Sequence, residues 1–192
     1  MKLEGKTIGF AITGSFCTFS KIKLVLEDLI SSGANVIPIF SYNAYTTDTR
    51  FGKATDFVKY VETLTKNKSV NTIAEAEKFG PNPILDILII APCTGNTLAK
   101  MVNGITDTPV LMAAKGHVRT GRPLVISIST NDALGANFKN IGALYHFKNV
   151  FFVPFNQDSP ENKPYSMIAD TNLIIPTIEK ALEKTQIQPV IL

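Results

Sequence analysis

Short runs of consecutive apolar residues recur along this chain at fairly even spacing. Such runs, with few or no charged residues, are typical of strands that are buried on both faces of a parallel sheet. The five predicted strands are Thr7–Ile12, Asn35–Phe40, Ile84–Ala91, Leu124–Ser129 and Val150–Phe155.

Between these runs, apolar residues recur every three or four positions, which predicts amphipathic helices. In the first such segment Ile22, Val25 and Leu29 share one face, and Gly33 follows its end. The predicted helices are Lys21–Ser31, Phe51–Leu64, Thr72–Phe79, Thr97–Val102, Pro109–Val118, Ala133–Leu144 and Thr171–Lys184. Alternating strands and helices indicate parallel βαβ units with right-handed crossovers. We therefore expect a three-layer, doubly wound α/β fold of the Rossmann or flavodoxin type, in a single domain over residues 1–192.

Composition fits such a domain and limits its partners. The 192 residues are 45% hydrophobic and 18% charged, which is enough to build a large core. A net charge of +3 is too small to indicate a nucleic-acid partner, although it is compatible with a small anionic ligand. Cys17 and Cys93 show neither metal-type nor disulfide-type spacing, so no metal and a reducing cytoplasm are expected. The apolar run Ile8–Ile12 is too short for a signal peptide or a membrane span.

Polar loops follow four of the predicted strands, at the edge where doubly wound folds bind their ligands. The first loop carries Thr13, Gly14 and Ser15 before a helix, where free N–H groups favour an anion. An ordinary capped turn explains this loop equally well. The dinucleotide fingerprint GxGxxG is not present in the sequence, which makes a nicotinamide dinucleotide less favoured.

The other three loops add hydroxyl and amide groups at the same predicted edge. Ser41 follows the second strand and Thr94–Thr97 the third, while Ser129 ends the fourth strand and Thr130 follows it. For Ser41 a plain polar loop is the simpler explanation, and for Asn96 and Thr97 it is helix capping. Four such loops at one edge favour a joint binding site more strongly than any loop does alone.

The loop Pro92-Cys93-Thr94-Gly95-Asn96-Thr97 resembles the Pro-Ala-Ser-Ala-Asn-Thr motif of the homo-oligomeric flavin-containing cysteine decarboxylases, a flavoprotein superfamily. Thr13-Gly14-Ser15 is similar to that family's Thr-Gly-Ser loop, and the resemblance runs from about Lys6 to Leu182. It implies flavin mononucleotide (FMN) as the cofactor and a homo-oligomer, a trimer or larger. Gly14 and Ser15 would hold the phosphate with help from Ser41. The implied cofactor residues are Thr13, Gly14, Ser15, Ser41, Thr94, Gly95, Asn96, Thr97, Ser129 and Thr130.

Two departures from the family pattern bear on the reaction. The region from Ser41 to Val58 lacks the histidine that the family's decarboxylases carry there. Of the family's substrate motif, Pro-x-Met-Asn-x-x-Met-Trp, only Pro109 remains. Cysteine decarboxylation is therefore disfavoured. The segments Ala113–His117 and Ser129–Gly135 instead resemble a branch of the family that forms a pyridine dicarboxylate with a dehydrogenase-like partner protein.

A basic segment after Pro109 supplies candidate groups for a small dicarboxylate substrate. We expect Lys115, His117 and Arg119 to bind its carboxylates as a basic cluster. Arginine is the better partner, because it binds carboxylates in a bidentate manner. His117 is the candidate base, with Lys115 as a second catalytic candidate. A solvated basic helix end is the competing explanation. Three alternative functions remain: one component of an oxidoreductase, a non-catalytic partner, and a flavin-dependent decarboxylase or prenyltransferase.

Overall fold

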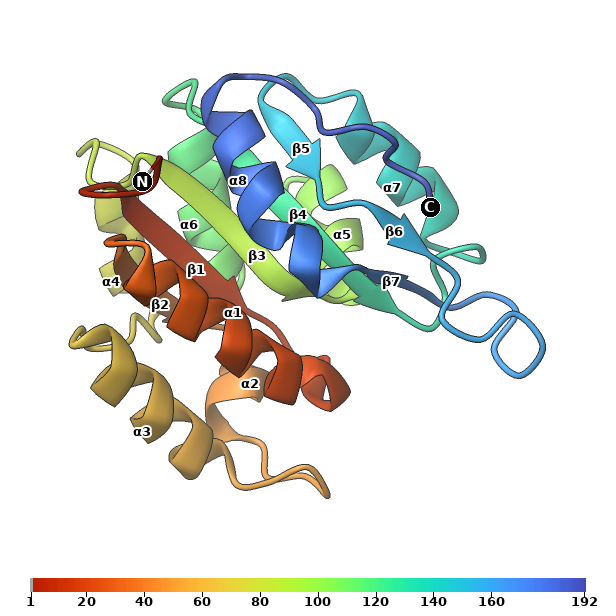
Figure 1. Ribbon diagram of the computed structural model, residues 1–192, viewed down its shortest axis with the longest axis horizontal. Coiled ribbons are helices and arrows are strands. Elements are labelled where there is room, and N and C mark those ends of the chain that lie inside the picture. The colour runs from red at the N-terminus through yellow and green to blue at the C-terminus, as the bar shows by residue number, and fades with distance from the viewer. Residues whose placement is uncertain (1) are drawn as a thin grey trace.

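The computed structural model describes residues 2–192 and contains a seven-stranded sheet flanked by helices (Figure 1). Strands β2, β1, β3 and β4 lie side by side in that order; β5 and β7 both pair with β4, and β6 lies beyond β7. The strands are β1 Thr7–Ile12, β2 Asn35–Phe40, β3 Ile87–Cys93, β4 Leu124–Thr130, β5 Val150–Phe152, β6 Phe155–Asn156 and β7 Met167–Ala169.

Helices cover both faces of the sheet, with α1 and α8 on one side and α5, α6 and α7 on the other (Figure 1). The helices are α1 Phe19–Ser31, α2 Tyr42–Thr46, α3 Ala54–Thr65, α4 Ile73–Ala76, α5 Gly95–Val102, α6 Pro109–Val118, α7 Phe138–Tyr145 and α8 Ile174–Leu182. Helix α6 begins as its sequence predicts, because Thr108 Oγ1 accepts a hydrogen bond from the Leu111 N–H at 3.2 Å and Pro109 occupies the first turn. No helix within residues 2–192 is both long and apolar enough to cross a membrane.

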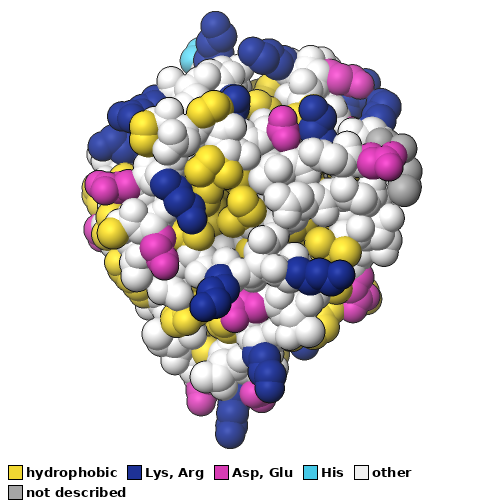
Figure 2. All heavy atoms as spheres, turned by 90° about the vertical axis from the view of Figure 1, so that its left-hand side faces the viewer, with side chains coloured by type: hydrophobic (Ala, Val, Ile, Leu, Met, Phe, Trp, Pro, Cys, Tyr) yellow, Lys and Arg dark blue, Asp and Glu magenta, His cyan; other side chains and the backbone are white. Residues whose placement is uncertain are grey.

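The parallel centre of the sheet forms the core. Every residue of β3 is buried, and β4 is buried up to its last residue, Thr130. This double-sided burial explains the uninterrupted apolar runs in the sequence. The outer surface differs from this buried core. Figure 2 shows lysine and arginine side chains interspersed with acidic ones around an apolar patch, in keeping with the small net charge.

The doubly wound α/β fold is confirmed, but the sheet is mixed rather than wholly parallel. Strand β7 runs antiparallel to both β4 and β6. The predicted strand Val150–Phe155 is interrupted before β6 at Pro154, which has no N–H to donate. The predicted helix Ala133–Leu144 begins only at Phe138, because the N–H groups of Gly135 and Asn137 both donate to the Asp132 carbonyl oxygen in tight turns.

The carboxyl-terminal segment packs along the outer side of β5 and β6. Gln186 Oε1 accepts a hydrogen bond from the Phe152 N–H at 2.8 Å, and Gln186 Nε2 donates to the Phe152 carbonyl oxygen at 2.7 Å. Phe155 then donates its N–H to the carbonyl oxygen of Val190. A single side-chain amide thus takes the place of a neighbouring strand at β5.

Candidate functional site

A cavity of about 530 Å³ lies at the carboxyl ends of the central strands. We call it the strand-end hollow. Its walls come from the loops after β1, β3 and β4, from the loop between α2 and α3, and from the loop between β6 and β7. Its lining includes Gly14, Ser15, Thr94, Ser129, Thr130 and Asn131. After β1 the chain forms β2 on one side of that strand, and it then crosses to form β3 on the other side. The hollow therefore lies at the point where the strand order reverses.

Thr13 fastens the first and third loops to each other beneath the hollow. Its side chain is buried; Oγ1 donates to the Pro92 carbonyl oxygen at 2.7 Å and accepts from the Thr94 N–H at 3.1 Å. Both hydrogen-bonding roles of this hydroxyl are therefore used inside the protein. Thr13 holds the loops in position instead of facing a ligand.

The first loop meets the end of β4 through a pair of hydroxyl groups. Ser15 Oγ and Ser129 Oγ lie 2.7 Å apart, so one hydroxyl donates to the other, and Ser129 keeps a proton to donate when Ser15 is the donor. Nothing among residues 2–192 accepts a hydrogen bond from the N–H groups of Gly14, Asn131 or Asp132. Backbone N–H and hydroxyl donors at converging loop ends are the groups that bind phosphate in proteins. The donor set of the hollow therefore fits the phosphate of a mononucleotide cofactor.

Gly95 permits the fourth loop to pack tightly on the start of α5. A Cβ atom at this position would lie 2.4 Å from Asn137 Nδ2, 2.6 Å from Asp132 Oδ1 and 2.7 Å from Thr130 Oγ1. Those three side chains form a network in which Asp132 accepts from Thr130 at 2.5 Å and from Asn137 at 2.8 Å. Asn137 was not identified from the sequence, because only the fold brings it against Gly95.

Besides Thr13 and Gly95, three of the implied cofactor residues lie outside the lining of the hollow. Ser41 Oγ caps α2 by accepting from the Ala44 N–H at 3.3 Å. Thr97 is buried and its hydroxyl lies 3.0 Å from that of Thr94. Asn96 is exposed at the start of α5. None of these three lines the hollow, whereas Gly14, Ser15, Thr94, Ser129 and Thr130 do.

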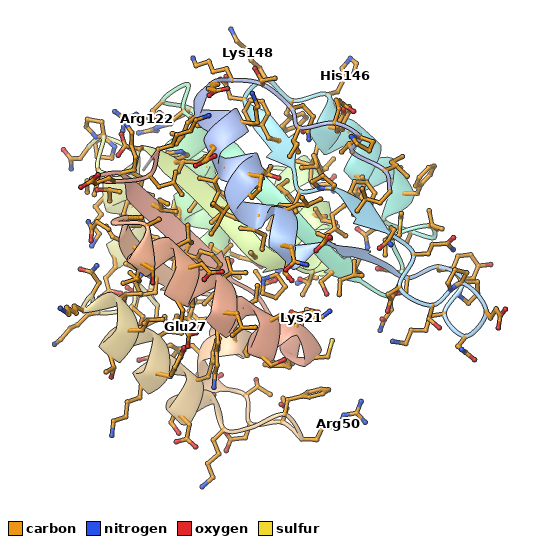
Figure 3. The ribbon with its side chains drawn as sticks, in the orientation of Figure 1. Lys21, Glu27, Arg50, Arg122, His146 and Lys148 are labelled. Atoms are coloured by element: carbon orange, nitrogen blue, oxygen red, sulfur yellow. The ribbon has the colours of Figure 1, made fainter. Side chains whose placement is uncertain are left out.

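The basic segment predicted to bind substrate lies at the opposite edge of the sheet. Lys115 and Arg119 line a separate groove with Leu124 and Val150, which are the first residues of β4 and β5. Figure 3 shows the neighbouring Arg122 at the far end of the molecule from Arg50, which lines the hollow. Within one chain the length of the strands therefore separates Lys115 and Arg119 from the cofactor loops, and their binding of the substrate stays a prediction.

His117 is likewise remote from the hollow and is fully enclosed. It is 1% exposed, and Nε2 donates to the Pro123 carbonyl oxygen at 2.9 Å. Burial lowers the pKa of its imidazole to about 4. A neutral, hydrogen-bonded imidazole inside the core fixes the end of α6 and cannot reach a ligand at the strand ends. Its expected role as the base is corrected for this reason.

Cys93 ends β3 beneath the hollow. It is completely buried, and burial raises the pKa of its thiol. A thiol held in its protonated form is a poor nucleophile, which agrees with a packing role.

A family model described as Flavoprotein matches residues 1–182, which is nearly the whole chain. The chain belongs to the Flavoprotein family. Among its relatives in this family, the B subunit of dipicolinate synthase from Bacillus subtilis (strain 168) is 48% identical over 189 residues, which cover 98% of this chain and 94% of that protein.

Solved structures agree with this assignment. The crystal structure of the dipicolinate synthase B subunit from Bacillus halodurans superposes with a TM-score of 0.91 at 44% identity, covering 100% of this chain and 98% of that one. The FMN-dependent cysteine decarboxylase SpaF superposes with a TM-score of 0.67 at 19% identity, covering 95% and 98% of the two chains, which shows a shared fold. The B subunit of dipicolinate synthase is thus a close homologue, and the family resemblance found in the sequence is confirmed.

Proposed function

We propose that this chain is the FMN-binding B subunit of a dipicolinate synthase and takes part in the oxidation of dihydrodipicolinate to dipicolinate. The observation that carries the proposal is the strand-end hollow itself. This flavoprotein is 48% identical to a dipicolinate synthase B subunit, and its free N–H and hydroxyl donors converge at the strand ends, the position at which doubly wound folds bind ligands.

Ser15, Ser129 and the N–H of Gly14 are the groups that would hold the phosphate. FMN is favoured among flavins because related folds include the FMN-dependent decarboxylase SpaF and the FMN-binding protein AtHal3. When bound, a flavin supplies an acceptor for the two electrons that a dihydropyridine must lose to become aromatic. The chain itself would bind the phosphate, orient the rings and hold the dicarboxylate close to them.

The existence of a B subunit implies an A subunit, and we propose the dehydrogenase-like A subunit of dipicolinate synthase as the partner. The substrate would be a small dicarboxylate, and the assembly a homo-oligomer of three or more copies. The mother-cell cytoplasm of a sporulating bacterium is the proposed location, which agrees with the Bacillus source of both close relatives.

A non-catalytic role is the second candidate function. It is favoured by the position of Lys115 and His117 at the far edge of the sheet, and by the absence of histidine from the described lining of the hollow. In that case the chain would stabilise the A subunit or deliver substrate to it. A flavin-dependent decarboxylase or prenyltransferase activity has less support, because the region from Ser41 to Val58 contains no histidine.

Anaerobic titration of the FMN-loaded protein with dihydrodipicolinate separates these functions. If the chain takes part in the oxidation, it is expected to lose its oxidised-flavin absorbance band as substrate is added, and to regain the band when oxygen is admitted. Dipicolinate, the product, should leave the band intact and serves as the control. An unchanged band with and without the partner, together with a higher activity of the A subunit when this chain is added, would instead establish the non-catalytic role.

A further inference from the structure

The loop between α2 and α3 places an arginine at the mouth of the strand-end hollow. This loop is held in a tight turn, because Thr49 and Gly52 exchange backbone hydrogen bonds at 3.0 and 3.1 Å. Asp48 Oδ1 also accepts from the Ala54 N–H at 2.9 Å, which anchors the turn to the start of α3. Arg50 and Phe51 occupy the tip of the turn, and both line the hollow.

The side chain of Arg50 rests on its neighbour. The centre of its guanidinium lies 4.9 Å from the centre of the Phe51 ring, and both side chains are exposed. Contact with an aromatic ring reduces the freedom of the long arginine chain while its N–H groups remain available. The guanidinium is thus partly ordered before any ligand arrives. Figure 3 shows Arg50 extending from its loop, away from Arg122 and Lys148 at the other end of the molecule.

The charges around the hollow leave Arg50 without a carboxylate partner. Within the part of the lining that the structure describes, the cations are Arg50 and Lys163. Lys163 lies 3.5 Å from Asp158, so its charge is balanced within its own loop. Asp132, a second acid in the wall, already accepts hydrogen bonds on both oxygens. Arg50 forms no ion pair with any residue from 2 to 192.

We propose that Arg50 binds a carboxylate group of the substrate in the strand-end hollow, with Phe51 holding the guanidinium in place. The inference rests on the proposed function, which supplies a substrate with two carboxylates beside the cofactor. A guanidinium donates two parallel hydrogen bonds to one carboxylate, so a fixed arginine recognises both the charge and the plane of that group. The loop after α2 thereby takes the substrate contact that the sequence pattern predicted for Lys115 and Arg119.

Binding of dipicolinate to the FMN-loaded protein, measured by isothermal titration calorimetry, tests this assignment. We expect Arg50→Ala to weaken binding by about 10- to 100-fold, the range for a hydrogen bond to a charged group. Arg50→Lys keeps the charge without the paired donors and should give a smaller loss. Lys148→Ala removes an exposed cation at the opposite end of the molecule and is the control, with unchanged affinity expected.

The uncharged diamide of dipicolinate isolates the contribution of charge. Wild-type protein should prefer the dicarboxylate, and Arg50→Ala should lose most of that preference. Equal dicarboxylate affinity in wild type and Arg50→Ala overturns the inference, as does a loss caused by Arg119→Ala in place of Arg50→Ala. Loss of affinity together with a changed assembly mass in light scattering would assign Arg50 to a contact between copies and also overturn it. A wild-type protein that takes up no FMN contradicts the proposed function instead, so the two failures are distinguishable.

Discussion

Ser15 and Ser129 are 114 residues apart in the chain, yet their hydroxyl oxygens lie 2.7 Å from each other. Ser15 follows β1 and Ser129 lies near the end of β4, and these strands are not neighbours in the sheet, because β3 lies between them. The contact spans the end of β3 and brings a donor from the loop after β1 to a donor at the end of β4. The proposed phosphate site therefore depends on the sheet topology as much as on the loop sequences.

Removal of either hydroxyl should weaken FMN binding. We expect Ser15→Ala and Ser129→Ala each to reduce FMN affinity by about 10-fold or more, because hydrogen bonds to a charged phosphate contribute roughly 1.5–3 kcal/mol. The double variant should lose less than the sum of the two, since the hydroxyls act as a pair. Ser32→Ala, which removes a hydroxyl that donates to the Leu29 carbonyl oxygen at the end of α1, is the control. Fluorescence titration measures the affinities, and wild-type affinity in both variants would show that the phosphate binds elsewhere.

A methyl group at Gly95 should disturb the network of Thr130, Asp132 and Asn137. Overpacking of this kind costs about 1–3 kcal/mol, and Gly95→Ala should lower both the free energy of unfolding and the FMN affinity. Gly142→Ala is the matched control, because a Cβ there meets nothing within 4 Å and the site lies within helix α7. It should raise the free energy of unfolding by about 0.5–1 kcal/mol. Urea unfolding curves decide the comparison, and an equally stable Gly95→Ala variant would refute the packing argument.

Burial of His117 makes the protein less stable in acid. Its pKa is lowered to about 4 in the folded state, against 6.5 for the exposed group. As the pH falls, the imidazole therefore takes up its proton at a higher pH in the unfolded chain than in the folded protein. The contribution of this group is intact above about pH 6.5 and is lost as the pH falls toward about 4, by at most about 1.4 kcal/mol per pH unit.

Unfolding free energies measured between about pH 7 and about pH 4.5 test this slope. His117→Gln keeps an N–H donor for Pro123 and should show a flatter pH dependence than wild type. His146→Gln changes an exposed side chain and should follow the wild-type curve. Parallel curves for wild type and His117→Gln would mean that the imidazole is not the group responsible.

The two cysteines should differ in their reactivity. Cys17 is exposed and Cys93 is buried, with a thiol pKa raised by burial. Iodoacetamide at neutral pH is expected to modify Cys17 in the folded protein and Cys93 only after unfolding, as read by peptide mass spectrometry. Rapid labelling of Cys93 in the folded protein would contradict its packing role.

The central fold was predictable because β1, β3 and β4 are buried almost throughout and α6 carries local start signals at Thr108 and Pro109. What followed Ser129 was harder to predict. The turns around Asp132 depend on Asn137 meeting Gly95, and β7 has only three residues paired with distant strands. Such short elements form through tertiary contacts that leave little local pattern.

Some residues of the candidate site could likewise be predicted from the sequence and others could not. Gly14, Ser15, Ser129 and Thr130 were predictable, because strand ends in a doubly wound fold meet at one edge. Arg50 was not, since an exposed loop residue shows no periodicity and its position depends on the turn between α2 and α3. His117 was taken for the catalytic base because in the sequence its imidazole lies near the basic residues Lys115 and Arg119. The fold instead buries the imidazole against the Pro123 carbonyl oxygen.

Binding of FMN and riboflavin to the flavin-free protein most directly tests the claim that the strand-end hollow holds a cofactor phosphate. The two ligands share the ring system and ribityl chain, and riboflavin lacks the phosphate. We predict that FMN binds at least about 100-fold more tightly than riboflavin, because two or more charge-assisted hydrogen bonds are lost without the phosphate. Ser15→Ala should reduce that ratio. Equal affinities for the two ligands, or failure of the protein to bind either, would contradict the account.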